Sequence, residues 1–373
     1  NCDGQVVSAG SVPFPGGFRL PPHADGTLPL PLDVPAKGKC FVNICYRCKQ
    51  DSALIKADHL LGFDEIPLQN SDPRNQDAVQ LLGRPAGDGL ITIRETDRML
   101  VLSCEQFTYA FNKLTGLFDK MTFANEPLLD QPMGFNVWRA PTDNDRKLKA
   151  DWYAAHYDHA ATNAYHTEYT VTASGVTLHT HVGIAAICVQ KFLDLDVTWT
   201  VANNGSVDLA LHAQRNTVFP ELPRFGLRLF LPQEMSQVNY YGMGPMECYR
   251  DKHHAASHSS YTATVWQLHE DYIRPQENGS HFDCDYVMLA GDAVRLTAVG
   301  TQPFSFNASH YTQEELTRKA HNYELEPCGS TVLCLDYAQN GIGSESCGPR
   351  LLEQYRLDDA AFDFGLRLIP EKK

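Results

Sequence analysis

The feature that most constrains this chain is an alternation of apolar and polar side chains at residues 192–201, Phe-Leu-Asp-Leu-Asp-Val-Thr-Trp-Thr-Val. A period of two places one face of an extended strand against a core and the other toward solvent. The strand runs into Asn203-Asn204-Gly205, and Asn-Gly between strands is a strong signal for a tight hairpin. Residues 209–212 continue as a strand beyond this turn. The sequence therefore predicts an antiparallel sheet here.

Short segments of the same kind recur along the chain, each bounded by turn-forming residues. They cover residues 41–46, 90–93, 100–102, 107–112, 168–173, 176–182 and 226–231, and residues 112–117 form a hairpin-like turn. Two segments favour a helix. One is residues 151–157; the other is residues 312–320, where Thr312 is expected to cap the helix and Glu315 to complete a capping box. A large antiparallel sandwich with almost no helix is the predicted fold.

The length of 373 residues predicts two or more domains. Residues 1–70 contain short strands with Gly and Pro between them, which indicates a small β-sandwich. Residues 71–89 are polar at first and then contain Pro and Gly, so we expect the linker there. Residues 90–373 are expected to form the larger domain.

Composition excludes several classes of partner. A net charge of −14 argues against nucleic acid and anionic membranes, and no apolar run approaches the roughly 20 residues that span a bilayer. Eleven cysteines without a repeating spacing favour a reducing cytosol and buried free thiols. Cys45 and Cys48 form one CxxC without a second pair, which does not favour a zinc or redox site. The chain opens at Asn1 rather than methionine, so we expect a piece of a longer protein.

Residues 139–145 read Arg-Ala-Pro-Thr-Asp-Asn-Asp and follow a strand-like apolar segment. Asp and Asn side chains bond to their own backbone, so this run predicts a stiff loop with outward-facing oxygens. The simpler alternative is a cap for the helix that follows. The residues alone leave both interpretations open.

Three further stretches accompany this motif. They are Tyr-Gly-Met-Gly-Pro-Met-Glu-Cys-Tyr-Arg-Asp at 241–251, Arg-Pro-Gln-Glu-Asn-Gly at 274–279, and a run from Phe-Ser-Phe-Asn-Ala-Ser at 304–309 to Gly-Ile-Gly-Ser-Glu-Ser-Cys-Gly-Pro at 341–349. In this order, the four resemble the C-terminal domain of the large β-galactosidases of glycoside hydrolase family 2. Each stretch is a weak signal alone, but the ordered set is not expected by chance.

The resemblance implies an all-β fold of two parts. Residues 1–70 would be an immunoglobulin-like β-sandwich that lacks one or two opening strands, and 71–89 the linker. Residues 90–373 would be the β-galactosidase small-chain domain, a large antiparallel supersandwich like that of galactose mutarotase. The chain would then be the C-terminal part of a bacterial, cytoplasmic enzyme that hydrolyses terminal β-D-galactose residues by a retaining double displacement. Its two catalytic carboxylates lie on an upstream barrel, so we expect this chain alone to be inactive.

The resemblance also implies site residues and partners. It places no catalytic residue, metal or cofactor on this chain; Mg and Na belong to the absent barrel. The expected partners are galactosides such as lactose, the catalytic barrel and further copies in a homo-oligomer, with no nucleic acid and no membrane. The expected sugar-facing residues are Asp143, Asn144, Asp145 and Arg146 in one loop, and Ser344, Glu345, Ser346 and Cys347 in another. Cys347 stands in the loop where the best-known relatives bring an aromatic ring under the sugar, so weaker glucose-side binding is expected.

Other interpretations remain open at this stage. Gly242 and Gly244 suggest a phosphate loop, but a tight sheet corner is favoured because no helix with Lys-Ser/Thr follows. Glu247 and Asp251 could pair as catalytic carboxylates, although a structural role for Glu247 is favoured.

Histidines raise two further alternatives. His179 and His181 share a strand face and could bind metal, but without a carboxylate or third histidine in register we expect solvent exposure. A rival function is a stand-alone carbohydrate-binding or mutarotase-like module. The second of these would need a His/Glu acid–base pair, for which His310 is the one candidate histidine.

Overall fold

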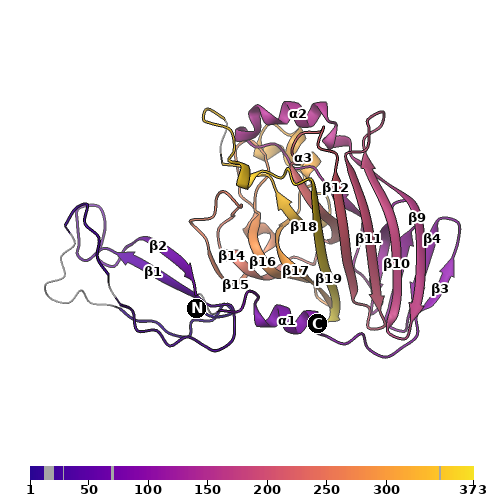
Figure 1. Cartoon of the computed structure of the whole chain (residues 1–373), viewed down its shortest axis with the longest axis horizontal. Coiled ribbons are helices and arrows are strands. Elements are labelled where there is room, and N and C mark those ends of the chain that lie inside the picture. Colours follow the sequence, from indigo (N-terminus) through magenta and orange to yellow (C-terminus); the bar gives the residue numbers. More distant parts are fainter. Residues whose placement is uncertain (12–20, 28, 69–70, 344–345) are drawn as a thin grey trace. The chain divides into compact units, whose positions relative to one another are not determined.

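The computed structural model describes residues 1–11, 21–27, 29–68, 71–343 and 346–373, and these form two compact units, Asn1–Val79 and Gln80–Lys373 (Figure 1). The division falls inside the segment expected to be a linker. That segment also contains an unpredicted helix, α1 (Gln76–Leu82). Asn75 begins it, because its side chain accepts hydrogen bonds from the backbone N–H groups of Asp77 and Ala78 at 2.9 and 3.2 Å.

The small unit contains one two-stranded antiparallel sheet, β1 (Phe41–Arg47) with β2 (Leu60–Pro67). The strand predicted at residues 41–46 is thereby confirmed. The described residues of this unit form no other named strand, so the immunoglobulin-like sandwich stays a prediction. A disulfide joins Cys2 to Cys40, and its two half-cystines are buried.

The large unit is built on a twelve-stranded antiparallel sheet. Its main path runs β15-β14-β16-β17-β19-β12-β11-β10-β9, while β13 pairs with β18 and β8, and β18 also pairs with β17. The strands are β8 (Gln131–Asn136), β9 (Ala161–Thr172), β10 (Gly175–Ala185), β11 (Leu193–Ala202), β12 (Val207–Arg215), β13 (Arg224–Pro232), β14 (Gln237–Gly244), β15 (Ser257–Thr264), β16 (His281–Ala290), β17 (Val294–Ser309), β18 (Ser330–Gln339) and β19 (Ala361–Lys372). β19 thus pairs on both sides, although it is the last strand in sequence.

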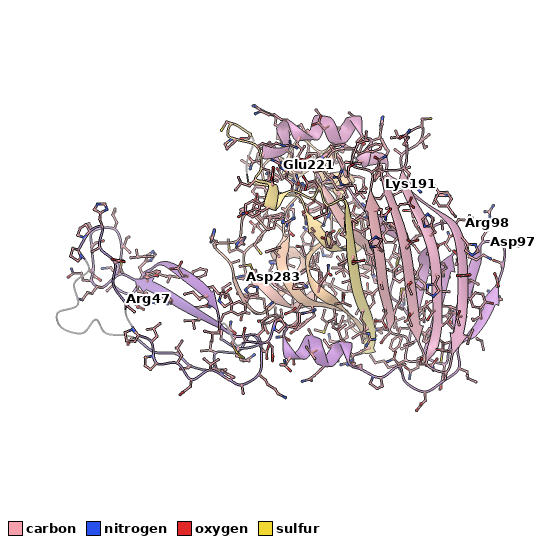
Figure 2. All side chains as sticks on the ribbon, in the orientation of Figure 1. Arg47, Asp97, Arg98, Lys191, Glu221 and Asp283 are labelled. Carbon is pink, nitrogen blue, oxygen red and sulfur yellow. A yellow bond between two sulfur atoms is a disulfide. The ribbon has the colours of Figure 1, made fainter. Side chains whose placement is uncertain are left out.

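A second, five-stranded sheet packs on this one. Its strands, in spatial order, are β3 (Thr92–Glu95), β4 (Met99–Ser103), β5 (Phe107–Asn112), β6 (Leu117–Phe123) and β7 (Glu126–Pro127). Trp199 of β11 bridges the two layers: its ring meets that of Phe118 edge-on at 5.3 Å, and its indole N–H donates to the Gly116 carbonyl at 3.0 Å. Side chains fill the interior of the unit (Figure 2). The predicted large antiparallel sandwich is confirmed.

The alternating segment forms β11 and pairs with β12 through the predicted Asn-Asn-Gly turn, from Leu193 opposite Arg215 to Val201 opposite Val207. Its even-numbered polar residues lie toward solvent and its odd-numbered apolar residues are buried. Gly205 has a φ of 85°, a conformation that favours glycine. Local sequence therefore determines this hairpin.

Helices are short. The region predicted at 151–157 contains α2 (Leu148–Ala154), followed by the 3₁₀ helix η2 (Tyr157–His159). The later prediction is confirmed as α3 (Gln313–Arg318), where the Thr312 hydroxyl accepts from the Glu315 N–H at 3.1 Å. The predicted capping box was wrong. The Glu315 carboxylate accepts hydrogen bonds from the Arg318 guanidinium and from the Glu326 N–H instead.

The second half of the expected linker is bound to the large unit. Asn204, in the β11–β12 turn, donates to the Pro85 carbonyl at 2.8 Å from its side chain and to the Ala86 carbonyl at 2.7 Å from its backbone. Arg84 pairs with Glu371 of β19 at 2.7 Å. These contacts attach residues 84–86 to the large unit.

The cysteines differ from expectation. Of the nine free thiols, only three, Cys248, Cys284 and Cys334, are buried. Cys45, Cys188 and Cys347 are exposed, so the expected burial of free thiols was wrong for most positions, and Cys2 and Cys40 are not free. None of the helices in the described ranges is both long and apolar enough to cross a bilayer.

Candidate functional site

The first predicted loop leaves β8 through buried Val137, Trp138 and Ala140 and enters the 3₁₀ helix η1 (Asp143–Arg146). The Asp145 carboxylate accepts hydrogen bonds from the backbone N–H and the hydroxyl of Thr142, at 2.8 and 3.1 Å. The capping interpretation of the Asp-Asn-Asp run therefore fits Asp145. Its oxygens face inward, so the expectation of outward-facing oxygens fails at this residue.

Arg139 connects this loop to the second one. Its side chain is fully buried. One guanidinium nitrogen donates to Asp145 at 2.7 Å and to the Gly341 carbonyl at 3.1 Å, and another donates to the Asn340 carbonyl. The guanidinium also lies 5.1 Å from the centre of the Trp152 ring of α2. One buried cation therefore holds the start of both loops.

Two further contacts join the loops near the surface. The Asn144 amide donates to the Ile342 carbonyl at 2.7 Å, and the Arg146 guanidinium donates to the Ser346 carbonyl at 3.0 Å. The loops are about 200 residues apart in sequence, yet they lie at one end of the unit. Both loops are expected to face the sugar, and these contacts bring their described residues together.

A third segment supports the second loop from the turn after β14. The Asp251 carboxylate accepts from the backbone N–H groups of Ile342 and Gly343, at 3.1 and 2.7 Å. A Cβ at residue 341 or 343 would come within 2.7 or 3.0 Å of that carboxylate, so glycine permits the close approach.

The loop residues differ in what they offer a ligand. Asp143, Arg146 and Cys347 are exposed, Asn144 and Ser346 are half-buried, and Asp145 is buried. Ser344 and Glu345 lie outside the described residues. Among the loop residues that the structure describes, the exposed charged groups are the Asp143 carboxylate and the Arg146 guanidinium.

Residues 103–368 match the family described as Beta galactosidase small chain. The chain belongs to this family. The β-galactosidase of Actinobacillus pleuropneumoniae is 37% identical over 370 residues, which cover 99% of this chain and 36% of the relative. The β-galactosidase of Staphylococcus xylosus is 33% identical, with 93% of this chain and 34% of the relative covered. This small-chain member thus spans about a third of the length of these relatives.

A solved structure, the galactose mutarotase-like protein from Lactobacillus casei ATCC 334, is similar over 73% of this chain and 100% of its own, with 11% identity and a TM-score of 0.40. This likeness is weak, and the strand pairing described above defines the fold of this β-galactosidase small-chain domain.

Glu247 has the structural role favoured from the sequence. Its carboxylate accepts from the Gly279 N–H at 2.9 Å, from the Lys252 ammonium at 2.8 Å and from the Tyr272 hydroxyl. Burial alone would raise the pKa of Glu247, but these hydrogen bonds outweigh it and hold the pKa below its usual range. The hydrogen bonds of Glu247 and Asp251 thus stabilise loops of this small-chain domain.

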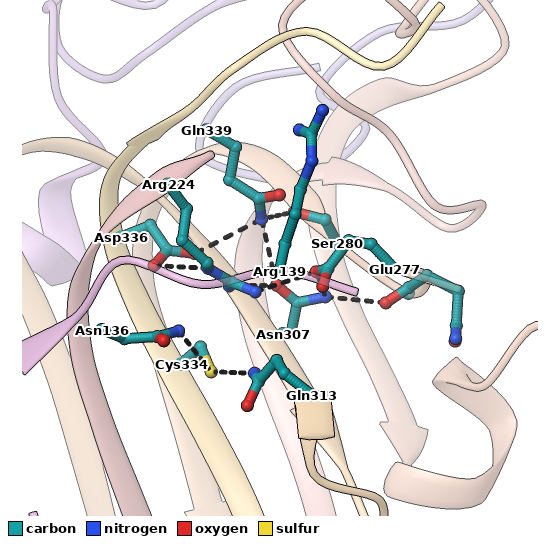
Figure 3. Close-up of polar contacts among 12 residues, drawn as sticks. Asn136, Arg139, Arg224, Glu277, Ser280, Asn307, Gln313, Cys334, Asp336 and Gln339 are labelled. Carbon is teal, nitrogen blue, oxygen red and sulfur yellow. Dashed lines mark hydrogen bonds and ion pairs between the residues drawn. The ribbon is translucent and has the colours of Figure 1, made fainter. Parts of the chain in front are cut away.

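A buried polar network lies beneath the second loop (Figure 3). Arg224 donates to Asp336 at 3.1 Å, to Glu277 at 3.0 Å and to Asn307 at 2.8 Å. Gln339, which precedes Asn340, donates to Asn307 at 3.1 Å. Burial raises the pKa of Glu277 and Asp336, and the Arg224 charge offsets part of this shift.

This network was missed from the sequence, although Glu277 stands in one of the four quoted stretches. The strand pattern around residues 224 and 336 gives no sign that a charge is buried there. Because the Arg224, Glu277 and Asp336 side chains are at most 2% exposed, we assign them to supporting the loop rather than to contacting substrate.

His310 lacks what a mutarotase base needs. It is buried, its Nδ1 lies 3.4 Å from the Ser330 carbonyl oxygen, and its ring packs at 4.7 Å on Trp266. No carboxylate in the described ranges bonds to its ring. The contacts therefore favour a structural role in this small-chain domain.

His181 corrects another expectation. Two carboxylates of β11 do lie in register with it: Asp196 at 2.9 Å from Nδ1 and Asp194 at 2.8 Å from Nε2. Asp194 also pairs with Lys191, which is labelled in Figure 2. His179 contacts Thr198 instead, at 3.0 Å. Among the residues that the structure describes, no group of three His, Cys, Asp or Glu could hold a metal ion, and this includes Cys45 and Cys48.

Proposed function

We propose that this chain is the C-terminal part of a β-galactosidase and forms one wall of a site for terminal β-D-galactose residues, such as that of lactose. The observation that carries the proposal is that Arg139, Asn144 and Arg146 join the first loop to the second through the carbonyls of residues 341, 342 and 346. Two polar loops held together at one end of a sandwich form a preorganised surface for a sugar with many hydroxyls.

The exposed groups suggest individual roles. Asp143 can accept hydrogen bonds from sugar hydroxyls, Arg146 can donate hydrogen bonds to them, and Asn144 and Ser346 border these two residues. We assign Asp145 to shaping the loop. Cys347 offers far less apolar area than an aromatic ring, so binding on the glucose side should be weak. For Ser344 and Glu345, the proposal of a sugar-facing position rests on the sequence alone.

The chemistry should lie elsewhere. Retaining hydrolysis needs two carboxylates about 5 Å apart beside the scissile bond. Near the loops, Asp145, Asp251 and Glu247 each accept hydrogen bonds from the protein, which leaves Asp143 as the exposed carboxylate of the group. We therefore propose that the acid/base and the nucleophile lie on a barrel outside this sequence, in a family 2 glycoside hydrolase.

Several partners follow from the same proposal. The barrel would cover the two loops, bind Mg and Na, and assemble with other copies as a cytoplasmic homo-oligomer. The alternative, a stand-alone carbohydrate-binding or mutarotase-like module, is not favoured by relatives that are named β-galactosidase and are about three times as long.

The proposal is tested in the full-length enzyme that contains this chain. Asp143→Ala should raise KM for nitrophenyl β-galactoside about tenfold, with a smaller change in kcat and unfolding free energy within about 0.5 kcal/mol of wild type. The matched control is Asp97→Ala in the exposed β3–β4 turn, where Figure 2 labels Asp97. An Asp143→Ala enzyme with wild-type KM would contradict the assignment of this loop.

A second arm uses the 373-residue chain alone. Highly purified chain should not hydrolyse the substrate. Turnover that disappears when one of the chain's own carboxylates is replaced would overturn the location of the chemistry while leaving the fold intact.

A further inference from the structure

Trp266 is the exposed member of the four tryptophans, all of which the structure describes. It is 50% exposed, whereas Trp138, Trp152 and Trp199 are at most 5% exposed. It lies in the 3₁₀ helix η3 (Val265–Leu268) between buried Val265 and Leu268. A large aromatic side chain left in water gains no burial free energy, so an exposed tryptophan on an ordered element calls for an explanation.

The Trp266 ring is held in place on several sides. Thr264 and Gln267 cap its helix reciprocally, with backbone-to-side-chain hydrogen bonds of 2.8 and 3.2 Å. His310, which is buried, packs against the ring with centroids 4.7 Å apart. The Trp266 ring is therefore preorganised, and binding a ligand would cost little of the conformational entropy of this side chain.

A second aromatic ring lies nearly perpendicular to the Trp266 ring. Tyr311 stands at 78° to Trp266 with centroids 5.9 Å apart, and His269 packs against Tyr311 at 5.1 Å. The Asp271 carboxylate lies 4.0 Å from His269 Nε2 and is 73% exposed. Tyr311 therefore links the exposed Trp266 ring to the His269 imidazole, which lies beside the exposed Asp271 carboxylate.

The surface continues through Asn322. Its amide donates to the Asp271 carboxylate at 2.9 Å, and its backbone N–H donates to the Ile273 carbonyl at 2.9 Å. On either side of Asn322, the rings of His321 and Tyr323 stack in parallel at 5.1 Å, and Tyr323 is 80% exposed. A second exposed ring pair therefore follows the first, with polar side chains between them.

We propose that these residues form a saccharide-binding surface: one neutral pyranose stacks on Trp266 with its hydroxyls toward His269 and Asp271, and a neighbouring sugar unit meets Tyr323. A pyranose has apolar C–H faces and hydroxyl-bearing edges, which match aromatic plates bordered by a carboxylate, an imidazole and an amide. The site uses no residue of the two loops, so it goes beyond the function proposed for them.

Other occupants match this chemistry less well. A flat apolar partner would remove Asp271 from water without replacing its hydrogen bonds, which is unfavourable. A nucleotide would stack equally well but would bring phosphate toward a carboxylate on a chain of net charge −14. A neutral sugar carries neither cost.

The test uses the 373-residue chain and methyl β-D-galactopyranoside, with methyl β-D-glucopyranoside in parallel. Because Trp266 is the exposed tryptophan, the sugar should shift its fluorescence to shorter wavelength as water leaves the ring. Ligands of this size reach about 1 mM at ordinary efficiency per atom, so titration to 50 mM should saturate the shift. Equal affinity for both sugars would indicate a general pyranoside surface; preference for one would indicate selection through His269 and Asp271.

Variants are compared by saturation-transfer NMR on the sugar signals, which needs no tryptophan emission. Trp266→Ala should weaken binding at least tenfold, Trp266→Phe should restore part of it, and Asp271→Ala should weaken it about threefold. The matched control is Tyr165→Ala, an aromatic residue of β9 that is 60% exposed. Circular dichroism identifies any variant that fails to fold, and Trp266→Phe keeps the test decisive if Trp266→Ala does so.

Three results would overturn the proposal. They are no sugar-dependent signal up to 50 mM, unchanged binding by folded Trp266→Ala, and a Trp266 emission shift that follows protein concentration rather than sugar. The last would identify the surface as a contact between copies of the chain. None of these results depends on the KM of the full-length enzyme. The proposed role of the two loops is therefore tested independently of this surface.

Discussion

The two units of the chain both contain paired β-strands but differ in how those strands are covered. In the small unit, β2 leaves Leu61 61% exposed and Ile66 46% exposed, and Phe41 is the one large apolar side chain that is buried among its described residues. In the large unit, Trp199 is fully buried between the two sheets, and Trp152 of α2 is fully buried as well. The comparison teaches that an apolar strand becomes stable when a second layer covers its apolar face, because most of the favourable free energy comes from that burial.

The small unit depends on other contacts in place of a covered core. Besides the Cys2–Cys40 disulfide, the Asp3 carboxylate accepts from the Lys39 N–H at 3.0 Å and from the Gln76 N–H at 3.2 Å. These tie residues near the start of the unit to its middle and its end. We therefore expect residues 90–373 to unfold as one cooperative unit and residues 1–70 to open at lower free energy.

The largest expected effect would come from breaking the layered core. Trp199→Ala removes the ring that contacts Phe118 and the N–H that meets Gly116, so it should cost the large unit about 4 kcal/mol of unfolding free energy. Urea unfolding followed by hydrogen exchange measures this loss separately for each unit. Exchange in β1 and β2 should not change, and equal destabilisation of both units would show that they fold together.

The next effect concerns the small unit. Cys40→Ser opens a covalent loop whose ends are 38 residues apart, and should cost this unit about 3 kcal/mol. Hydrogen exchange of β1 and β2 under non-reducing conditions measures the loss. Cys188→Ser, which replaces an exposed free thiol of the large unit, is the control. If β1 and β2 are as protected as β11 before the substitution and after it, the proposed difference between the units does not exist.

A third prediction separates the units by pH. Burial lowers the pKa of His281, in the large unit, to about 4, against 6.5 when exposed. Between those values the unfolded chain binds a proton that the folded chain does not, so stability falls as pH falls. From pH 7.5 to pH 5 the loss should be about 2 kcal/mol.

The measurement is urea unfolding of the large unit at both pH values, for wild type and for His281→Asn. The variant is less stable at pH 7.5 because Tyr240 loses its partner at 3.0 Å, but it should lose about 2 kcal/mol less than wild type on acidification. Glu277 and Asp336, whose pKa values are raised, titrate in both proteins and cancel in the difference. Parallel pH dependence in the two proteins would rule out a buried neutral His281.

The smallest effect concerns the first residues of the large unit. Arg84→Gln removes the half-exposed ion pair with Glu371 and should cost only about 0.5 kcal/mol, because solvent screens it. Its clearer signature is faster hydrogen exchange at residues 82–88, with β19 unchanged. Unchanged exchange there would mean that the contacts of Asn204 and Arg367 hold this segment without Arg84. Arg94→Gln on exposed β3 serves as control.

Sequence predicts this molecule well where the determining contacts are local. The β11–β12 hairpin follows from its own alternation and its Asn-Gly turn, and α3 follows from Thr312. Helix α1 had a local signal too, the cap at Asn75, but its polar sequence was interpreted as linker. Short polar helices and linkers share a composition, so only the cap distinguishes them.

The candidate site depended on contacts that no local pattern contains. That the two loops meet was predicted from the family resemblance, whereas the inward orientation of Asp145 depends on Arg139 and on carbonyls near residue 340. The partners of His181 were closer to prediction: Asp194 and Asp196 stand on the polar face of the alternating strand, and pairing it with residues 176–182 would have brought them together.

The position of β19 has a consequence for how the chain is made. It pairs with β12 on one side, Val207 opposite Leu368, and with β17 on the other, Val294 opposite Lys372. A ribosome therefore releases both neighbouring strands long before the strand that joins them exists. Until residues 361–372 emerge, β12 and β17 each present an unpaired edge, the kind of surface that captures other chains. We expect the nascent large unit to need a chaperone during synthesis, and its folding to be limited by this one late and distant pairing.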